Sequence, residues 1–264
     1  MEKLSLLLFS NSEFLILLCF TFVILIIGYF LYQLYYFKSE KHRSILSLVL
    51  MMLIYTVISF WKLGSTSFPT TTWQPTAEKQ QITFDFGKSE KFDAIYTIYG
   101  EGDTNSNPST YQIGTNNIHL YASNDLQEWT RIASLKQGNI YTYAIEQGNW
   151  QYRYIKLVDL SENSSLSEIG FRKEDHTGFL PISILRDKQK DGPYPGSLLI
   201  DEQDKLVLSP TYYDQAYFDE IYHVRNAWEI ANGQYMYANV HPLLGTNIIA
   251  LSIRLFGMNP FAWR

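Results

Sequence analysis

The segment ITFDFGKSEKFDAIYTIYG, residues 82–100, decides the fold of the largest part of this chain. It contains two runs rich in Ile, Phe, Tyr and Thr, at 81–86 and 92–100, which flank a short polar stretch with a glycine. Period-two alternation of such residues predicts strands that bury one face. Four similar runs follow, each bounded by Gly, Asn, Asp or Ser: 117–123, 129–135, 141–145 and 152–160. The sequence therefore predicts an antiparallel β-sandwich within residues 64–180.

A polar turn, Ser123-Asn124-Asp125, stands between two of these runs. Asn and Asp tolerate left-handed backbone geometry and hydrogen-bond to their own backbone, so this stretch predicts a hairpin. Trp129, at the start of the next run, is expected to point into the core.

Two N-terminal segments, 14–37 and 44–63, are almost continuously apolar. At about 1.5 Å per residue, each can cross the roughly 30 Å hydrocarbon core of a bilayer as a helix. The loop between them, residues 38–43, carries two lysines and an arginine. Because such loops stay in the cytoplasm, the chain after residue 63 is expected on the outer face of the plasma membrane. A cleaved signal peptide is the alternative, but the first run is long and no small-residue cleavage site follows it.

Charge and cysteine content narrow the class of protein. The net charge of −5 argues against a nucleic-acid partner, which requires a basic face. The single cysteine, Cys19, lies in an apolar run, so no intramolecular disulfide can form. An outer domain without disulfides is typical of a bacterial surface protein. We expect a multi-pass membrane protein that contacts membrane lipid.

The C-terminal third predicts a connector and two helices. Residues 181–213 are interrupted by Gly and Pro and predict a connector with one hairpin, LLIDEQDKLVL at 198–208. Residues 214–232 run from a capping Asp214 through apolar residues at helical spacing to Asn-Gly, which predicts an amphipathic helix of about five turns on the membrane surface. The apolar run 243–256 is roughly 20 Å long and predicts the start of a third membrane helix. Arg254 within that run requires an interface or a partner.

Four motifs resemble the discoidin (coagulation factor 5/8 type C) jelly-roll family. They are ITFDFGKSEKFDAIYTIYG, NIHLYASNDLQEWTRIAS, YRYIKLVDL and LSEIGF, in this order. The resemblance implies a jelly roll whose loops at one end bind carbohydrate or lipid head groups, so the loop 100–114 is a candidate site for a cell-surface glycan. The alternative is a plain polar loop. Glu101 and Asp103 within it are candidate calcium ligands.

The C-terminal segment resembles the protein O-mannosyltransferases and related membrane-embedded (C-type, family 39) glycosyltransferases. The resemblance lies in an Asp-Glu pair followed by an arginine, an H-P-x-L-G motif and the string FGMNPF. The matching residues are Phe218, Asp219, Glu220, His223, Arg225, His241, Pro242, Leu244, Gly245 and 256–261. Two residues depart from the family pattern: Leu243 replaces a proline, and Thr246 replaces a lysine. If that lysine contacts the donor phosphate in the family, this chain differs in how it binds the donor or in which donor it binds.

That resemblance implies transfer of a sugar from a polyprenyl-phosphate donor to an acceptor hydroxyl on the outer face, with no cofactor required. By resemblance Asp219 is the catalytic base. Asp219 and His223 lie four positions apart and share a helix face. By the same resemblance Glu220, the second acid of the catalytic pair, and His223 would orient the acceptor or the base. Arg225 and His241 are assigned to the phosphate leaving group. The alternative is that Asp219 and Glu220 are simply acids in the first turn of a helix, where the helix dipole favours negative charge.

The expected fold class is a membrane protein of α plus β type. It comprises two transmembrane helices (1–63), an extracytoplasmic jelly-roll sandwich (64–180), a connector (181–213), and an interfacial helix with a partial third membrane helix (214–264). Two functions follow. One is the N-terminal portion of a glycosyltransferase, expected to be inactive without a helical half that is missing or separately encoded. The other is a membrane-tethered carbohydrate-binding module.

Overall fold

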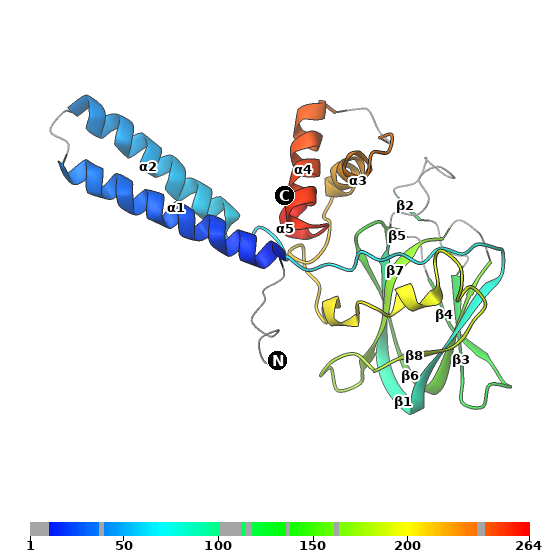
Figure 1. The fold of residues 1–264 in the computed structure, drawn as a ribbon. Coiled ribbons are helices and arrows are strands. Elements are labelled where there is room, and N and C mark those ends of the chain that lie inside the picture. Colours follow the sequence, from blue (N-terminus) through cyan, green and yellow to red (C-terminus); the bar gives the residue numbers. More distant parts are fainter. Residues whose placement is uncertain are drawn as a thin grey trace, which may run out of the picture.

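The computed structural model describes residues 11–36, 40–100, 112–113, 118–135, 138–160, 164–236 and 241–264. Within these residues the chain forms a helical hairpin, an antiparallel β-sandwich and a C-terminal group of helices (Figure 1). The hairpin projects away from the sandwich, and the C-terminal helices stand between the two.

The hairpin consists of α1 (Asn11–Tyr36) and α2 (Glu40–Phe60), close to the apolar runs predicted at 14–37 and 44–63. Large apolar side chains are exposed along both helices, for example Leu25 at 67% and Met51 at 64%. Among the described residues, Arg43–Phe60 is the one helical stretch long and apolar enough to cross a membrane, and none of it is buried. Two apolar helical stretches are shorter: Thr21–Gln33 and Leu243–Phe256.

Eight strands make up the β-structure. Their bounds are β1 Gln80–Tyr99, β2 Gln112–Ile113, β3 Ile118–Ser123, β4 Thr130–Ser134, β5 Gly138–Asn139, β6 Tyr143–Asp159, β7 Leu166–Lys173 and β8 Ser183–Asp187. Six of them form one antiparallel sheet in the order β4-β3-β6-β1-β7, with β8 also paired to β1. The short strands β2 and β5 pair separately.

Two long strands create the two layers of the sandwich. The first half of β1 lies between β6 and β8, whereas its second half lies between β6 and β7. The register of β1 against β6 shifts between Asp85 and Glu90, where the polar stretch interrupts the pairing. The runs predicted as separate strands, 81–86 with 92–100 and 141–145 with 152–160, are therefore two continuous bent strands. The separation was wrong because pairing across the bulge, which is not a local property, keeps each strand continuous.

The core lies between the layers. On β3, the buried Ile118, Leu120 and Ala122 alternate with partly exposed neighbours, as the period-two pattern predicts. The prediction that Trp129 points into this core was wrong. Its ring is partly exposed on the outer face, where the Lys156 ammonium lies 4.0 Å from the ring centroid; a cation above an indole face is a favourable arrangement.

The connector packs against β7 and the second half of β1. Beyond β8 it forms two 3₁₀ turns, η2 (Gly196–Leu199) and η3 (Gln203–Lys205), so the hairpin predicted at 198–208 was wrong. Tyr96 on β1 donates a hydrogen bond of 2.7 Å to the Leu208 carbonyl. This cover explains why the second half of β1 is buried on both faces.

The C-terminal helices are α3 (Glu220–Ala231), α4 (Leu243–Phe256) and α5 (Pro260–Trp263). The N-terminal cap predicted at Asp214 is instead at Asp219, five residues later, because the Asp214 carboxylate accepts hydrogen bonds from Thr211. The apolar face of α3 is buried within the protein, so the prediction that this face rests on the membrane was wrong. α5 is hydrogen-bonded to the segment that follows α2, through the Phe261 amide and the Ser65 carbonyl at 2.9 Å.

Candidate functional site

Three of the five residues assigned to the transferase site lie at the N-terminal end of α3. Asp219 is the residue before the helix; it is exposed, and its carboxylate makes no capping hydrogen bond. Phe218 precedes it with a φ of 50°, a conformation unusual for a non-glycine residue, and its ring is 78% exposed. Asp219 and His223, four positions apart, share a face. The Asp219 carboxylate is therefore accessible to a ligand.

Glu220 is held in an ion pair. Its two carboxylate oxygens lie 2.7 Å and 2.8 Å from Nε and Nη2 of Arg264, and the Tyr217 amide donates to it at 2.9 Å. Arg264 also donates to the carbonyl of Leu63 at 3.1 Å. A bidentate pair of this kind fixes a position, so Glu220 joins the start of α3 to the C-terminal arginine and to the residues that follow α2.

The two histidines come together from different elements. The ring centroids of His223, on α3, and His241, just before α4, are 4.8 Å apart, with an interplanar angle of 44°. His241 is exposed and His223 is half-buried. The sequence assigned both to one site, and the fold places them side by side.

Arg225 lies apart from this group. Its side chain is 2% exposed, and its Nε lies 3.0 Å from Oε1 of Glu229, which is 1% exposed. A buried guanidinium engaged by a buried carboxylate is not offered to a phosphate at the surface. The pair holds the interior face of α3, so the group that the structure brings together is Asp219, Glu220, His223 and His241.

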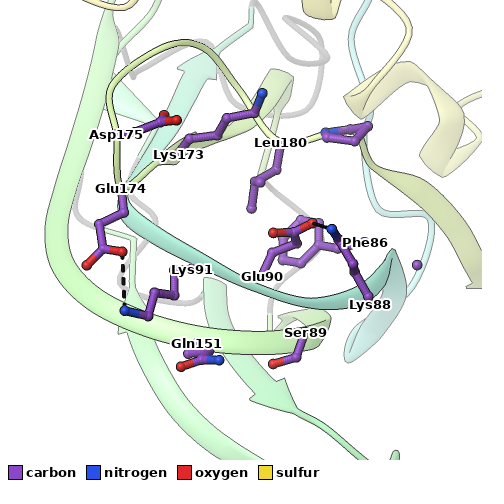
Figure 2. A pocket seen from close by; sticks show the side chains of 12 residues that line it. Phe86, Lys88, Ser89, Glu90, Lys91, Gln151, Lys173, Glu174, Asp175 and Leu180 are labelled. Carbon is purple, nitrogen blue, oxygen red and sulfur yellow. Dashed lines mark ion pairs between the residues drawn. The ribbon is translucent and has the colours of Figure 1, made fainter.

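A cleft of about 810 Å³ opens on the sandwich, lined by the bulge of β1, by β6 and by the chain between β7 and β8 (Figure 2). Phe86 and Leu180 form an apolar floor; they are 7% and 4% exposed. Charged and polar side chains ring this floor. They are Lys88, Ser89, Glu90, Lys91, Gln151, Lys173, Glu174 and Asp175.

Ion pairs occupy part of the rim. Lys91 lies 3.4 Å from Glu174, and Lys88 lies 3.3 Å from Glu90; Figure 2 marks both pairs with dashed lines. Among the described side chains, none forms an ion pair with Lys173. Hydrogen bonds from the Thr177 hydroxyl and amide lower the pKa of Asp175, so it is ionised at neutral pH. The rim therefore offers donors and acceptors above an apolar surface.

The sequence did not indicate this cleft, because the bulge reads as an ordinary polar turn and the other walls come from distant strands. The candidate ligand loop inferred at 100–114, with Glu101 and Asp103, lies mostly outside the described residues.

Three carboxylates gather on the other side of β7. Oxygens of Glu168, Asp201 and Glu202 all lie within 4.8 Å of one another, and Glu168 is fully buried. Burial raises the pKa of Glu168 to about 8. Such oxygens suit a hard cation, but these are already used. Lys205 pairs with Glu202, the Thr71 amide donates to Glu202 at 2.9 Å, and Gln203 donates to Glu168. The Lys205 ammonium, paired with Glu202, therefore supplies the positive charge that a bound cation would otherwise bring to these carboxylates.

A surface network borders β1 and β7. Arg172 makes a bidentate pair with Asp93, at 2.8 and 2.9 Å, and His176 Nε2 lies 2.6 Å from the same carboxylate. The hydrogen bond from Arg172 is the main cause of the lowered pKa of Asp93.

No protein-family model matches the chain, and no curated protein matches it. Among solved structures, the chain is similar to a carbohydrate-binding module, CpGH89CBM32-6, produced by Clostridium perfringens, with 22% identity over 42% of this chain and 82% of that one and a TM-score of 0.32. CpGH89CBM32-5 from the same organism, in complex with GalNAc-β-1,3-galactose, shows 16% identity over 39% and 76%, with a TM-score of 0.32. A fragment of a putative chitobiase from Bacteroides thetaiotaomicron shows 18% identity over 45% and 78%, with a TM-score of 0.30. These likenesses add nothing to the strand pairing described above.

Proposed function

We propose that the chain is a membrane-tethered module whose β-sandwich binds carbohydrate in the cleft above Phe86 and Leu180. The observation that carries this proposal is the pairing of an apolar floor with a rim of hydrogen-bonding side chains. Sugars present C–H faces and hydroxyl edges, and a site of this composition meets both. Pockets that combine an apolar lining with a few placed polar groups are the usual form of small-ligand sites.

The tether in this proposal is the α1–α2 hairpin. Both helices expose apolar side chains, from Phe22 to Tyr36 in α1 and from Ile45 to Phe60 in α2, which water does not favour and hydrocarbon does. Helices satisfy their backbone groups internally, as a bilayer requires. The basic residues at 38–43 favour a cytoplasmic turn, which leaves the sandwich outside the plasma membrane, in reach of cell-surface glycans.

The test is a saccharide titration of the full chain in lipid nanodiscs, after a screen of neutral and acidic glycans. Gln151→Ala and Lys173→Ala each remove one rim group. We expect Gln151→Ala to weaken binding about two- to tenfold, the effect of one lost neutral hydrogen bond, and Lys173→Ala to weaken it at least about tenfold, the effect of one lost charge-assisted hydrogen bond. Gln127→Ala and Lys190→Ala are matched controls at exposed positions outside the cleft. Binding that survives both cleft variants unchanged would show that the site lies elsewhere.

A second function is favoured by one observation, which is a group of acidic and histidine side chains next to the start of the apolar helix α4. The group consists of Asp219, Glu220, His223 and His241. This group suits the transfer of a sugar from a polyprenyl phosphate. The pairing of Glu220 with Arg264 leaves Asp219 as the base. Such transfer requires that the nanodisc-held chain bind undecaprenyl phosphate and that His241→Ala weaken this binding. Sugar transfer by the nanodisc-held chain that Asp219→Asn abolishes would establish the enzyme.

A further inference from the structure

α4 has two apolar faces, and only one of them is covered. Thr246, Ala250 and Ile253 are buried on the side that packs against α3. The opposite side carries a stripe of large aliphatic residues, all more than half exposed. They are Leu244 at 73%, Ile248 at 59%, Leu251 at 57% and Leu255 at 55%. At about 100° per residue these four side chains fall within an arc of about 60°.

The one charged residue of α4 is turned away from this stripe. Arg254 donates from Nε and Nη2 to the Ala231 carbonyl, at 3.1 and 2.9 Å, and from Nη2 to the Ile230 carbonyl at 3.4 Å. These are the last carbonyls of α3, where the helix dipole favours a cation. The guanidinium therefore caps α3, and the outward stripe contains no charge.

The position of α4 is tied to the end of α2. The helix α5, which follows α4 directly, is hydrogen-bonded to Ser65, and Arg264 donates to Leu63. The phenyl rings of Phe60 and Phe261 also lie 6.1 Å apart. Ser65 lies only five positions beyond Phe60, the end of α2, which is at most about 17 Å of chain. α4 also contacts α1.

We infer that the Leu244–Leu255 stripe of α4 rests on the outer surface of the lipid bilayer, with the helix lying in the plane of the membrane. The inference depends on the proposed insertion of α1 and α2. The hydrocarbon that surrounds the exposed side chains of the hairpin ends where α2 ends, and α4 is attached there. A helix of 14 residues is about 21 Å long, too short to span. One apolar stripe with polar flanks is the pattern of an interfacial helix.

This placement gives the molecule two contacts with one membrane. The hairpin anchors the chain, and α4 prevents free rotation about the short linker that leaves the anchor. Because α3 packs on the side of α4 opposite the stripe, it is then held about 8–10 Å farther from the bilayer than α4.

The test measures lipid contact at chosen positions of the full chain. In a Cys19→Ser background, Ile248→Cys and Leu251→Cys are each labelled with an environment-sensitive fluorophore and placed in nanodiscs of phosphatidylcholine and phosphatidylglycerol. Met51→Cys, midway along α2, reports the anchor, and Gln127→Cys, on the sandwich, is the aqueous control. Lipids with a quencher near the head group are compared with lipids quenched near the chain end.

We expect head-group quenchers to reduce the signal at positions 248 and 251 about twofold or more and to leave position 127 unchanged, as for a helix at the interface. Position 51 should respond to the deep quencher. If positions 248 and 251 stay open to aqueous iodide while position 51 is quenched, the anchor stands and the α4 contact is overturned. If position 51 is not quenched, the anchor itself fails. Protection of position 248 from both quenchers in particles that hold two chains would assign the stripe to a second copy and also overturn the inference.

Discussion

The buried carboxyl group of Glu168 should make the sandwich less stable as the pH rises. One oxygen accepts from the Gln203 amide and the other from the Glu202 backbone amide at 3.2 Å, but neither donor carries charge. Burial raises the pKa of Glu168 to about 8, from an ordinary value of 4.5. The folded state therefore keeps the proton over a pH range in which the unfolded chain releases it. The contribution of Glu168 to the free energy of unfolding is complete below about pH 4.5 and is lost as the pH approaches 8.

The magnitude follows from that interval. Each pH unit over which only the unfolded state is ionised lowers the free energy of unfolding by about 1.4 kcal/mol. The whole interval of about 3.5 pH units corresponds to about 5 kcal/mol, an upper bound that relaxation and water entry would reduce, against a typical total of about 5–15 kcal/mol. Glu168→Gln places a neutral group of the same shape there and removes this dependence.

Denaturant unfolding of the full chain in a non-ionic detergent, at several pH values between 5 and 8, measures the difference. We expect the wild type to lose stability across the range and Glu168→Gln to lose much less. Glu128→Gln, at an exposed position, is the matched control and should behave as the wild type. Parallel pH profiles for the wild type and Glu168→Gln would refute the reasoning, as would a wild type whose stability is flat.

Three further outcomes are expected. Glu229→Ala should cost about 3–5 kcal/mol in denaturant unfolding because it leaves the Arg225 guanidinium buried without its carboxylate, whereas an Arg225→Met, Glu229→Leu double variant should recover most of the loss. Gly64→Ala should cost about 1–3 kcal/mol, since a Cβ there would lie 2.6 Å from a backbone carbon of α5; an unchanged unfolding midpoint would contradict that contact. Asp93→Asn should reduce the loss of stability below about pH 4, because Arg172 holds the pKa of Asp93 low and the pair is broken as the pH falls; the check is an acid titration followed by tryptophan fluorescence.

Local pattern predicted the elements of this chain better than their continuity. The alternation in 117–123 became β3, and the apolar run 243–256 became α4 with the same bounds. The bulge within β1 and the unbroken course of β6 escaped the sequence, because each depends on a partner strand more than 40 residues away. Trp129 illustrates the same limit: its ring lies against the Lys156 ammonium of β6, a contact with a distant strand that the local pattern does not show.

The candidate sites divide in the same way. The sequence alone determined that apolar segments precede a β-rich domain, that Asp219 and His223 share one helix face, and that Arg254 needs a partner, because composition and helical period are local properties. Only the tertiary structure decided that Glu220 is paired with Arg264 and that Arg225 is buried with Glu229. It also decided where the cleft lies and which side of α4 is left uncovered. These outcomes depend on which distant groups exclude water from one another, and a charge has no fixed role until its neighbours in space are known.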